Sequence, residues 1–282
     1  MIWIYDYPNF LIGLVIVGLM VGVALGGHRL FRRFVPWEAT EESNALALGM
    51  LGIVAMMLSL LLAFCSVSVW EAFSSAEAAA VNEASVSGEL VRDLAVYGGP
   101  KAAAAREAVR DYLRTVVDKE WPAMAKGGHS EEASHKFNAI FRIAALIEPR
   151  TAREQIMLGE IWSKANELNL HRRGRLNAAG VSAVPGALWW TLLLGILINF
   201  TLFYLLPVKS FNDLMQGLYA GMLGLTLFFI VVMDQPFSGA VSVSPEPARE
   251  ALVSMQRWDA EAAALSGAKA APKTGVLKES RN

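Results

Sequence analysis

The sequence predicts an all-α integral membrane protein with four transmembrane helices and a helical-bundle extramembrane domain between spans two and three. Hydrophobic residues make up 54% of the 282 residues and charged residues only 18%, which is too apolar for an ordinary soluble domain. The apolar residues gather in four long runs. The segment between the second and third runs is rich in Ala, Glu and Arg and lacks β-strand alternation, so it is expected to be helical.

The first two runs predict a hairpin over residues 1–70, with spans at about 10–26 and 45–69. The second run has 25 uncharged residues, enough for a helix to cross a hydrocarbon layer of about 30 Å. Neither Pro nor Gly lies between Ile53 and Ser87, so this helix is expected to continue past the membrane surface. One long helix therefore links the membrane to the extramembrane domain.

The extramembrane domain is predicted over residues 71–184 as a four-helix bundle that begins with the extension of the second span. A Gly-Gly-Pro sequence at 98–100 is expected to end that extension, and Ser130 to cap the third helix of the bundle. Amphipathic helices of this length pack together and bury their apolar stripes. The stripe expected on the fourth helix consists of Ile156, Leu158, Ile161, Trp162 and Leu168.

The other two runs predict a second hairpin over residues 185–234, with spans at about 187–206 and 214–233. Residues 235–265 are expected to form a turn and an amphipathic helix after the membrane. The tail 266–282 is rich in Ala, Lys and Gly and is expected to be disordered.

Positive charge in the short loops predicts the orientation. Arg29, Arg32 and Arg33 follow the first span and Lys209 follows the third, whereas the N-terminal leader has no Lys or Arg. The positive-inside rule places those two loops in the cytoplasm and the bundle in the periplasm of a bacterial inner membrane. The first run is followed by Arg instead of a small-residue cleavage site, so a multi-pass protein without a cleaved leader is expected.

Glycines repeat at close helical spacing in two spans. Gly18, Gly22 and Gly26 lie on one face of the first span, and Gly217 and Gly221 on one face of the fourth. Small residues let helix backbones approach closely in lipid. Two such faces are more close-packing surface than the four spans of one chain need among themselves. A homo-oligomer surrounded by membrane lipid is therefore expected.

The second span carries a face of small and hydroxyl residues with two larger side chains between them. Close packing against another helix is one interpretation, and the wall of a narrow pore that conducts inorganic ions is the other. In the pore interpretation the serine hydroxyls replace part of the hydration shell of an ion, and the larger side chains form a constriction. The candidate pore-lining residues are Gly52, Met56, Ser59, Leu62, Ala63 and Ser66.

Charged residues cluster in two places outside the predicted spans. They could form a solvated surface, pair between helices or subunits, contact lipid phosphate, or form the charged mouth of a pore. These residues are Glu71, Glu77, Arg172, Arg173 and Arg175.

Several function classes are disfavoured by the sequence. It has no enzyme motif, no phosphate-binding loop and only scattered histidines, so neither an enzyme nor a metal or other cofactor is expected. A net charge of −1 gives no reason to expect nucleic acid as a partner. The spans have no Asp, Glu, Lys, Arg or His at depth, which argues against proton-coupled transport.

Four stretches together resemble the DUF4239 family of bacterial membrane proteins, often labelled bestrophin-like. They are LLLAFCSVSVWEAFSSAEAAAVNEA, VRDYLRTVVDKEWPAMAKG, LNLHRRGRLNAA and MDQPFSGAVSVSPEP, in the family's order between the predicted spans. The common variant of the last stretch has Arg between Asp and Pro, where this chain has Gln235. The matching motif residues, expected to be structural, are Trp121, Pro122, Asp234, Pro236, Phe237 and Gly239.

The bestrophin label implies a passive ion channel. Bestrophins are pentameric channels with four spans, a pore along the long second helix and a Pro-Phe-Gly turn after the fourth span. They keep the termini and the intervening domain in the cytoplasm, opposite to the orientation that the loop charges favour here. The sequence therefore predicts an oligomeric ion channel, with a non-conducting membrane sensor or scaffold that couples the bundle to a partner as the alternative.

Overall fold

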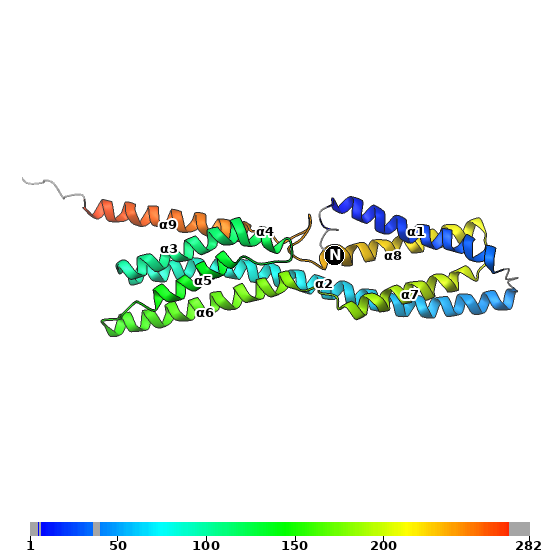
Figure 1. Cartoon of the computed structure of the whole chain (residues 1–282), viewed down its shortest axis with the longest axis horizontal. Coiled ribbons are helices and arrows are strands. Elements are labelled where there is room, and N and C mark those ends of the chain that lie inside the picture. The colour runs from blue at the N-terminus through cyan, green and yellow to red at the C-terminus, as the bar shows by residue number, and fades with distance from the viewer. Residues whose placement is uncertain (1–4, 6, 36–39, 271–282) are drawn as a thin grey trace, which may run out of the picture. The chain divides into compact units, whose positions relative to one another are not determined.

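The structure, a computed structural model, describes residue 5, residues 7–35 and residues 40–270, and its regular elements are helices (Figure 1). The predicted all-α class is therefore confirmed. The elements in chain order are α1 (Asn9–Phe34), α2 (Glu41–Tyr97), α3 (Gly99–Thr115), a π-helical segment (Val116–Glu120), α4 (Trp121–Met124), α5 (Glu131–Ala144), α6 (Ala152–Gly180), α7 (Gly186–Tyr204), α8 (Ser210–Met233) and α9 (Glu246–Ala270).

Four of these helices are long and apolar enough to cross a membrane: α1, α2, α7 and α8. The four predicted spans are thus confirmed as candidate spans, with α3 to α6 between the second and third. The long helix is also present, because α2 runs unbroken for 57 residues.

Glycine backbone conformation and a side-chain cap explain the predicted end of α2 and the predicted start of α5. Gly98 and Gly99 have φ values of 77° and 84°, a left-handed conformation that favours glycine, so α2 stops there and α3 starts with proline in its first turn. Ser130 caps α5, because its side chain accepts a hydrogen bond from the backbone N–H of Ala133 at 3.3 Å. Helix α9 continues to Ala270, beyond the expected end at residue 265. The predicted disorder from 271 to 282 lies outside the described residues.

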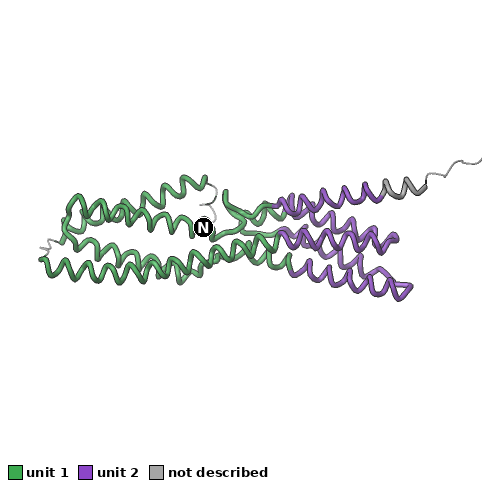
Figure 2. The backbone as a smooth tube through the Cα atoms, turned by 180° about the vertical axis from the view of Figure 1, so that it is seen from behind, with its two compact units in different colours: residues 1–80, 120–129, 171–244 green, residues 81–119, 130–170, 245–282 purple. Residues whose placement is uncertain are grey.

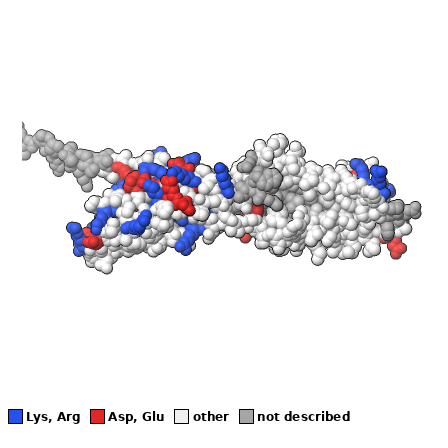
Figure 3. Space-filling view, viewed as in Figure 1, with Lys and Arg blue, Asp and Glu red and all other residues white. Residues whose placement is uncertain are grey.

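The chain divides into two compact units (Figure 2). Unit 1 comprises residues 1–80, 120–129 and 171–244, and unit 2 comprises residues 81–119, 130–170 and 245–282. The division within α2 falls between Ala80 and Val81, whereas the sequence suggested a boundary at residue 70. On the face in Figure 3, charged side chains crowd the helices of unit 2 and are nearly absent over the candidate spans.

Unit 1 has its core between the candidate spans. The face of α2 that carries Leu58 and Leu62 packs against Phe200 of α7 and Leu227 of α8 in one hydrophobic cluster. Helix α8 also packs along α1, with Gly224 at the closest approach: a Cβ added there would lie 2.9 Å from the Cα of Val17.

The two glycine faces predicted from the sequence have different surroundings. On α8, Gly217 and Gly221 face α1, with side-chain atoms 3.8 and 3.9 Å from where a Cβ would be. On α1, no heavy atom of the described chain lies within 4 Å of the corresponding positions of Gly18, Gly22 and Gly26. The α1 glycine face is therefore open within one protomer.

Unit 2 is held together by apolar contacts and by ion pairs between its helices. Helix α5 packs on α3, and Tyr112 and Phe137 meet edge to face there with ring centroids 5.3 Å apart. Asp259 of α9 accepts hydrogen bonds from Arg106 and Arg110 of α3, so α9 is fastened to the same helix.

The sequence prediction for the apolar stripe of α6 was wrong at Ile156, which is 77% exposed. Ile161 and Leu168 on the same helix are buried, as expected. Ile156 precedes Ile161 by five residues, or about 500° of helix, so it points about 140° away from the buried face.

Candidate functional site

The membrane part of α2 has two faces with different roles. Leu62 is only 3% exposed and packs in the core of unit 1, so it differs from the exposed candidate pore-lining residues. Met56 is 70% exposed, Ser59 and Ala63 are exposed, and no heavy atom lies within 4 Å of a Cβ placed on Gly52. Ser66 is half-buried. Except for Leu62, these residues lie on faces of α2 that the core leaves accessible.

Both serines of this face use their hydroxyl hydrogen inside the helix. Ser59 Oγ donates to the carbonyl oxygen of Ala55, and Ser66 Oγ donates to that of Leu62, each at 2.8 Å. A hydroxyl has one hydrogen and two lone pairs, so each oxygen still presents acceptor capacity to a ligand.

A groove of about 280 Å³ lies beside this face, between α2 and α8. We call it the α2–α8 groove. Apolar atoms dominate its walls, with hydroxyl groups contributed from both helices. Its lining residues are Ser59, Leu62, Ala63, Ser66, Tyr219, Met222, Leu223 and Thr226.

A buried ionic cluster lies elsewhere in unit 1, around Glu120. Arg175 Nη2 donates to its carboxylate at 2.6 Å and Arg172 Nη2 at 3.1 Å, and both Glu120 and Arg175 have no exposed surface. The Arg175 guanidinium also lies 5.2 Å from the ring centroid of Trp121. Sequence reasoning did not identify Glu120 as a partner for these arginines. The available signal was that Arg172 and Arg175 are three residues apart and so share a helix face.

The other charged candidates are at the surface. Glu71, Glu77 and Arg173 are exposed, so they are free to meet solvent, lipid or another subunit. The structure therefore separates the five charged residues into a buried pair of arginines and three surface charges.

The motif residues meet in one structural cluster of unit 1. The indole N–H of Trp121 donates to the carbonyl oxygen of Val243 at 3.0 Å, and its ring meets Phe237 edge to face with centroids 5.7 Å apart. Ser238 Oγ donates to the carbonyl oxygen of Ala125 at 2.9 Å. Pro122 follows Trp121 in the first turn of α4. These contacts fasten α4 to the turn that follows α8.

Asp234 supports the same turn from the other side. Its carboxylate accepts hydrogen bonds from the backbone N–H of Val184 at 2.9 Å and from Ser182 Oγ at 2.7 Å. The carbonyl of Pro236 accepts from the backbone N–H of Val243 at 2.8 Å, and Gly239 has a φ of 82°. The motif therefore closes a compact turn next to α7 and α8.

A model of the Bestrophin-like domain matches residues 18–248 of the chain. The protein belongs to the Bestrophin-like family. The resemblance stated from the sequence is thereby confirmed. No curated protein matches the chain.

Solved structures with this fold come from a bacterial bestrophin homolog of Klebsiella pneumoniae, in point-mutant forms. One has a TM-score of 0.60 at 15% identity, covering 88% of this chain and 98% of that chain. Another has a TM-score of 0.57 at 15% identity, covering 87% and 96%. A crystal structure described only as a membrane protein gives a TM-score of 0.59 at 14% identity, covering 89% and 97%. At these identities the likeness concerns the fold alone.

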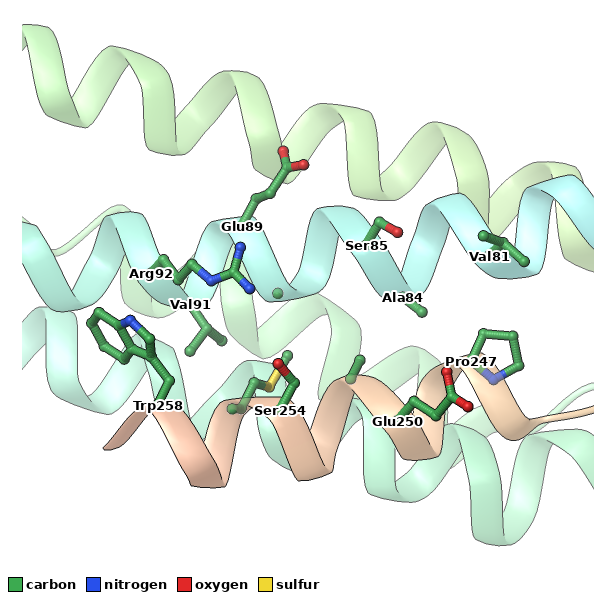
Figure 4. A pocket seen from close by; sticks show the side chains of 13 residues that line it. Val81, Ala84, Ser85, Glu89, Val91, Arg92, Pro247, Glu250, Ser254 and Trp258 are labelled. Carbon is green, nitrogen blue, oxygen red and sulfur yellow. The ribbon is translucent and has the colours of Figure 1, made fainter. Parts of the chain in front are cut away.

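Unit 2 of this Bestrophin-like protein has a second groove, of about 410 Å³, between α2 and α9 (Figure 4). Its charged side chains are Glu89, Arg92 and Glu250, and Trp258 closes one end. Glu89 is engaged by Lys164 at 2.7 Å. Charges of both signs are spread along this groove and do not converge on one point. Within the described ranges, no three His, Cys, Asp or Glu side chains are grouped so that they could hold a metal ion.

A polar cluster that sequence reasoning missed lies where α1 meets the turn between α7 and α8. His28 is completely buried, and its Nε2 lies 3.0 Å from the carbonyl oxygen of Leu206. Because a carbonyl only accepts, Nε2 carries the hydrogen, and the unpaired Nδ1 lies 3.7 Å from Asp213 Oδ1. Arg32 Nη2 donates to the same Leu206 oxygen at 2.6 Å.

Proposed function

We propose that this Bestrophin-like membrane protein is a homo-oligomeric passive ion channel whose pore is lined by α2 of each copy. The observation that supports this most directly is the two-faced character of α2. One face builds the core of unit 1, while the other presents Gly52, Ser59 and Ala63, which are exposed, and Ser66, which is half-buried beside α8. An uncovered face of this kind in a membrane helix suits either a neighbouring subunit or an aqueous path.

The proposed pore-lining residues are Gly52, Met56, Ser59, Ala63 and Ser66. Ser59 and Ser66 are seven residues apart, so their hydroxyls lie about two turns or 10 Å apart along the helix. Met56 is the exposed large side chain of the set and is our candidate for a dewetting constriction. Leu62 is left out because it belongs to the protomer core.

The surface charges would set ion preference. Glu71 and Glu77 follow the span on α2, so rings of them in an oligomer would attract cations. Arg173 on α6 would favour anions instead. Lipid phosphate is a further partner that these exposed charges could contact.

The function is tested in planar bilayers with purified oligomers whose mass has been verified in lipid nanodiscs. We expect unitary currents whose size or selectivity changes with Ser59→Ala and Ser66→Ala. Thr191→Ala is the matched control, because Thr191 on α7 also donates to the carbonyl four residues before it and is exposed. A silent bilayer that contains intact oligomers, across both polarities and several salts, would overturn the channel proposal.

The second candidate function is a non-conducting sensor or scaffold, and the continuity of α2 favours it. An unbroken helix from a membrane span into unit 2 can carry a displacement without any ion flow. We propose no enzymatic activity for either candidate.

We propose a bacterial inner membrane as the location, with the domain between α2 and α7 in the periplasm. Lys126→Cys on a Cys65→Ser background tests this, because Lys126 is exposed and neighbouring Gly127 has a φ of 72° that disfavours cysteine. Labelling of intact spheroplasts by an impermeant maleimide is expected. Labelling only after lysis would place the domain in the cytoplasm.

A further inference from the structure

Buried polar atoms without a hydrogen-bond partner gather on α7 and α8. Among the described residues they include both ends of the Asn199 amide, Oε1 of Gln216 and Oη of Tyr219. Asn199 and Gln216 have no exposed surface. Buried polar groups in folded proteins are nearly always paired with protein or with ordered water, so these atoms point to a bound hydrogen-bonding ligand.

The protein's own groups do not satisfy these atoms. Gln216 Nε2 donates to the carbonyl oxygen of Ala24 at 3.0 Å, which leaves its amide oxygen unused. Asn199 and Tyr219 face one another, but a direct bond between them would use only one position of the Asn199 amide. A partner for these atoms must therefore donate to an amide oxygen and, at Asn199, also accept from an amide nitrogen.

Tyr219 connects this place to the α2–α8 groove, since it also lines the groove. Thr226 Oγ1, on the groove wall, donates to the carbonyl oxygen of Met222 at 3.1 Å. Ser59 and Ser66 donate to carbonyls of their own helix in the same way. All three hydroxyls have thus used their only hydrogen, and their oxygens can still accept a hydrogen bond from a ligand.

We propose that bound water occupies the α2–α8 groove and extends past Tyr219 to Asn199 and Gln216. Water both donates and accepts, and it is small enough for the space beside a fully buried amide. The groove, at about 280 Å³, exceeds the space of about 10–15 Å³ that a single water molecule needs. The site lies within one protomer and does not depend on whether the oligomer conducts ions.

Radiolytic labelling in nanodiscs tests the inner part of this site. X-rays generate hydroxyl radicals from water in place, and mass spectrometry then locates the oxidised side chains. We expect label on Tyr219 and none on Tyr204, whose hydroxyl donates to the carbonyl oxygen of Val23 at 2.6 Å. Asn199→Leu should remove label from Tyr219, whereas Thr201→Val, at an exposed threonine of α7, should not. An unlabelled Tyr219, or label that Asn199→Leu leaves unchanged, would overturn the proposal.

Cysteine reactivity tests the groove without altering Asn199. On a Cys65→Ser background, Thr226→Cys is compared with Leu225→Cys, its neighbour at the same depth but outside the groove lining. Methanethiosulfonates react with the thiolate, which forms in contact with water. Faster modification at position 226 supports the proposal. Equal rates at the two positions, or no modification at 226, would show that the groove holds no water of its own.

Discussion

Neutralising Glu120 tests the buried ionic cluster most directly. Glu120→Gln keeps the shape of the side chain and two oxygen lone pairs but removes its negative charge. We expect a large loss of stability, because two guanidinium groups donate to this carboxylate and neither Glu120 nor Arg175 has exposed surface.

The magnitude follows from the two hydrogen bonds and their burial. A hydrogen bond to a charged group stabilises by about 1.5–3 kcal/mol and a neutral one by about 0.5–1.5 kcal/mol, so two bonds lose about 2 kcal/mol together. Water does not screen the lost attraction here, and breaking a buried pair by removing one partner costs about 3–5 kcal/mol. We expect a loss of about 2–4 kcal/mol, since glutamine retains some hydrogen bonding.

The assay is thermal unfolding followed by size-exclusion chromatography in one detergent at one heating rate, because membrane proteins commonly unfold irreversibly. The expected fall in the apparent Tm is roughly 5–15 °C. Glu132→Gln is the matched control: Glu132 pairs with Lys119 at 2.5 Å, but both side chains are about half exposed. Such a surface pair contributes about 0–1 kcal/mol. If Glu120→Gln lowered the Tm no more than Glu132→Gln, the reasoning about burial would be refuted.

Four further variants test other parts of the structure. Gly224→Val should lower stability by about 1–3 kcal/mol because its Cβ would meet backbone at 2.9 Å, whereas Gly18→Val should leave the isolated protomer unchanged; chromatographic thermal scans compare them. Burial, and secondarily the nearby Glu160 carboxylate, raises the pKa of Asp93, so its contribution to stability is present at low pH and is lost as pH rises through the raised pKa. Asp93→Asn should therefore raise the Tm at pH 7–8, with the gain shrinking toward pH 4, and a gain constant with pH would contradict this. Asp234→Ala leaves a buried backbone N–H without its acceptor and should cost about 1–3 kcal/mol in the same scans; an unchanged Tm would exclude that role.

The sequence was sufficient to predict the features that depend on residues close together along the chain, namely the extent of α2 and two helix ends. The uncharged run from Ala45 to Val69 and the lack of Pro or Gly between Ile53 and Ser87 were enough to predict the long α2. The ends at Gly98 and Ser130 followed from backbone conformation and from a side chain that caps the next turn. These signals are local because a helix forms its hydrogen bonds within four residues.

Only the tertiary structure decided which faces of these helices meet. The sequence shows glycine faces on both α1 and α8, but the structure covers the face of α8 and leaves Gly18, Gly22 and Gly26 open. On α2 it places Leu62 in the core while Ser59 remains exposed.

The sequence also did not show which side chains hydrogen-bond to one another in the polar clusters. Arg172 and Arg175 meet a carboxylate 52 and 55 residues away, and the amide of Asn199 is fully buried opposite Tyr219 of another helix. Residue spacing fixes which side chains share a face of one helix. The rotation of that helix about its axis, which decides what the face meets, is set by the packing of all its neighbours together.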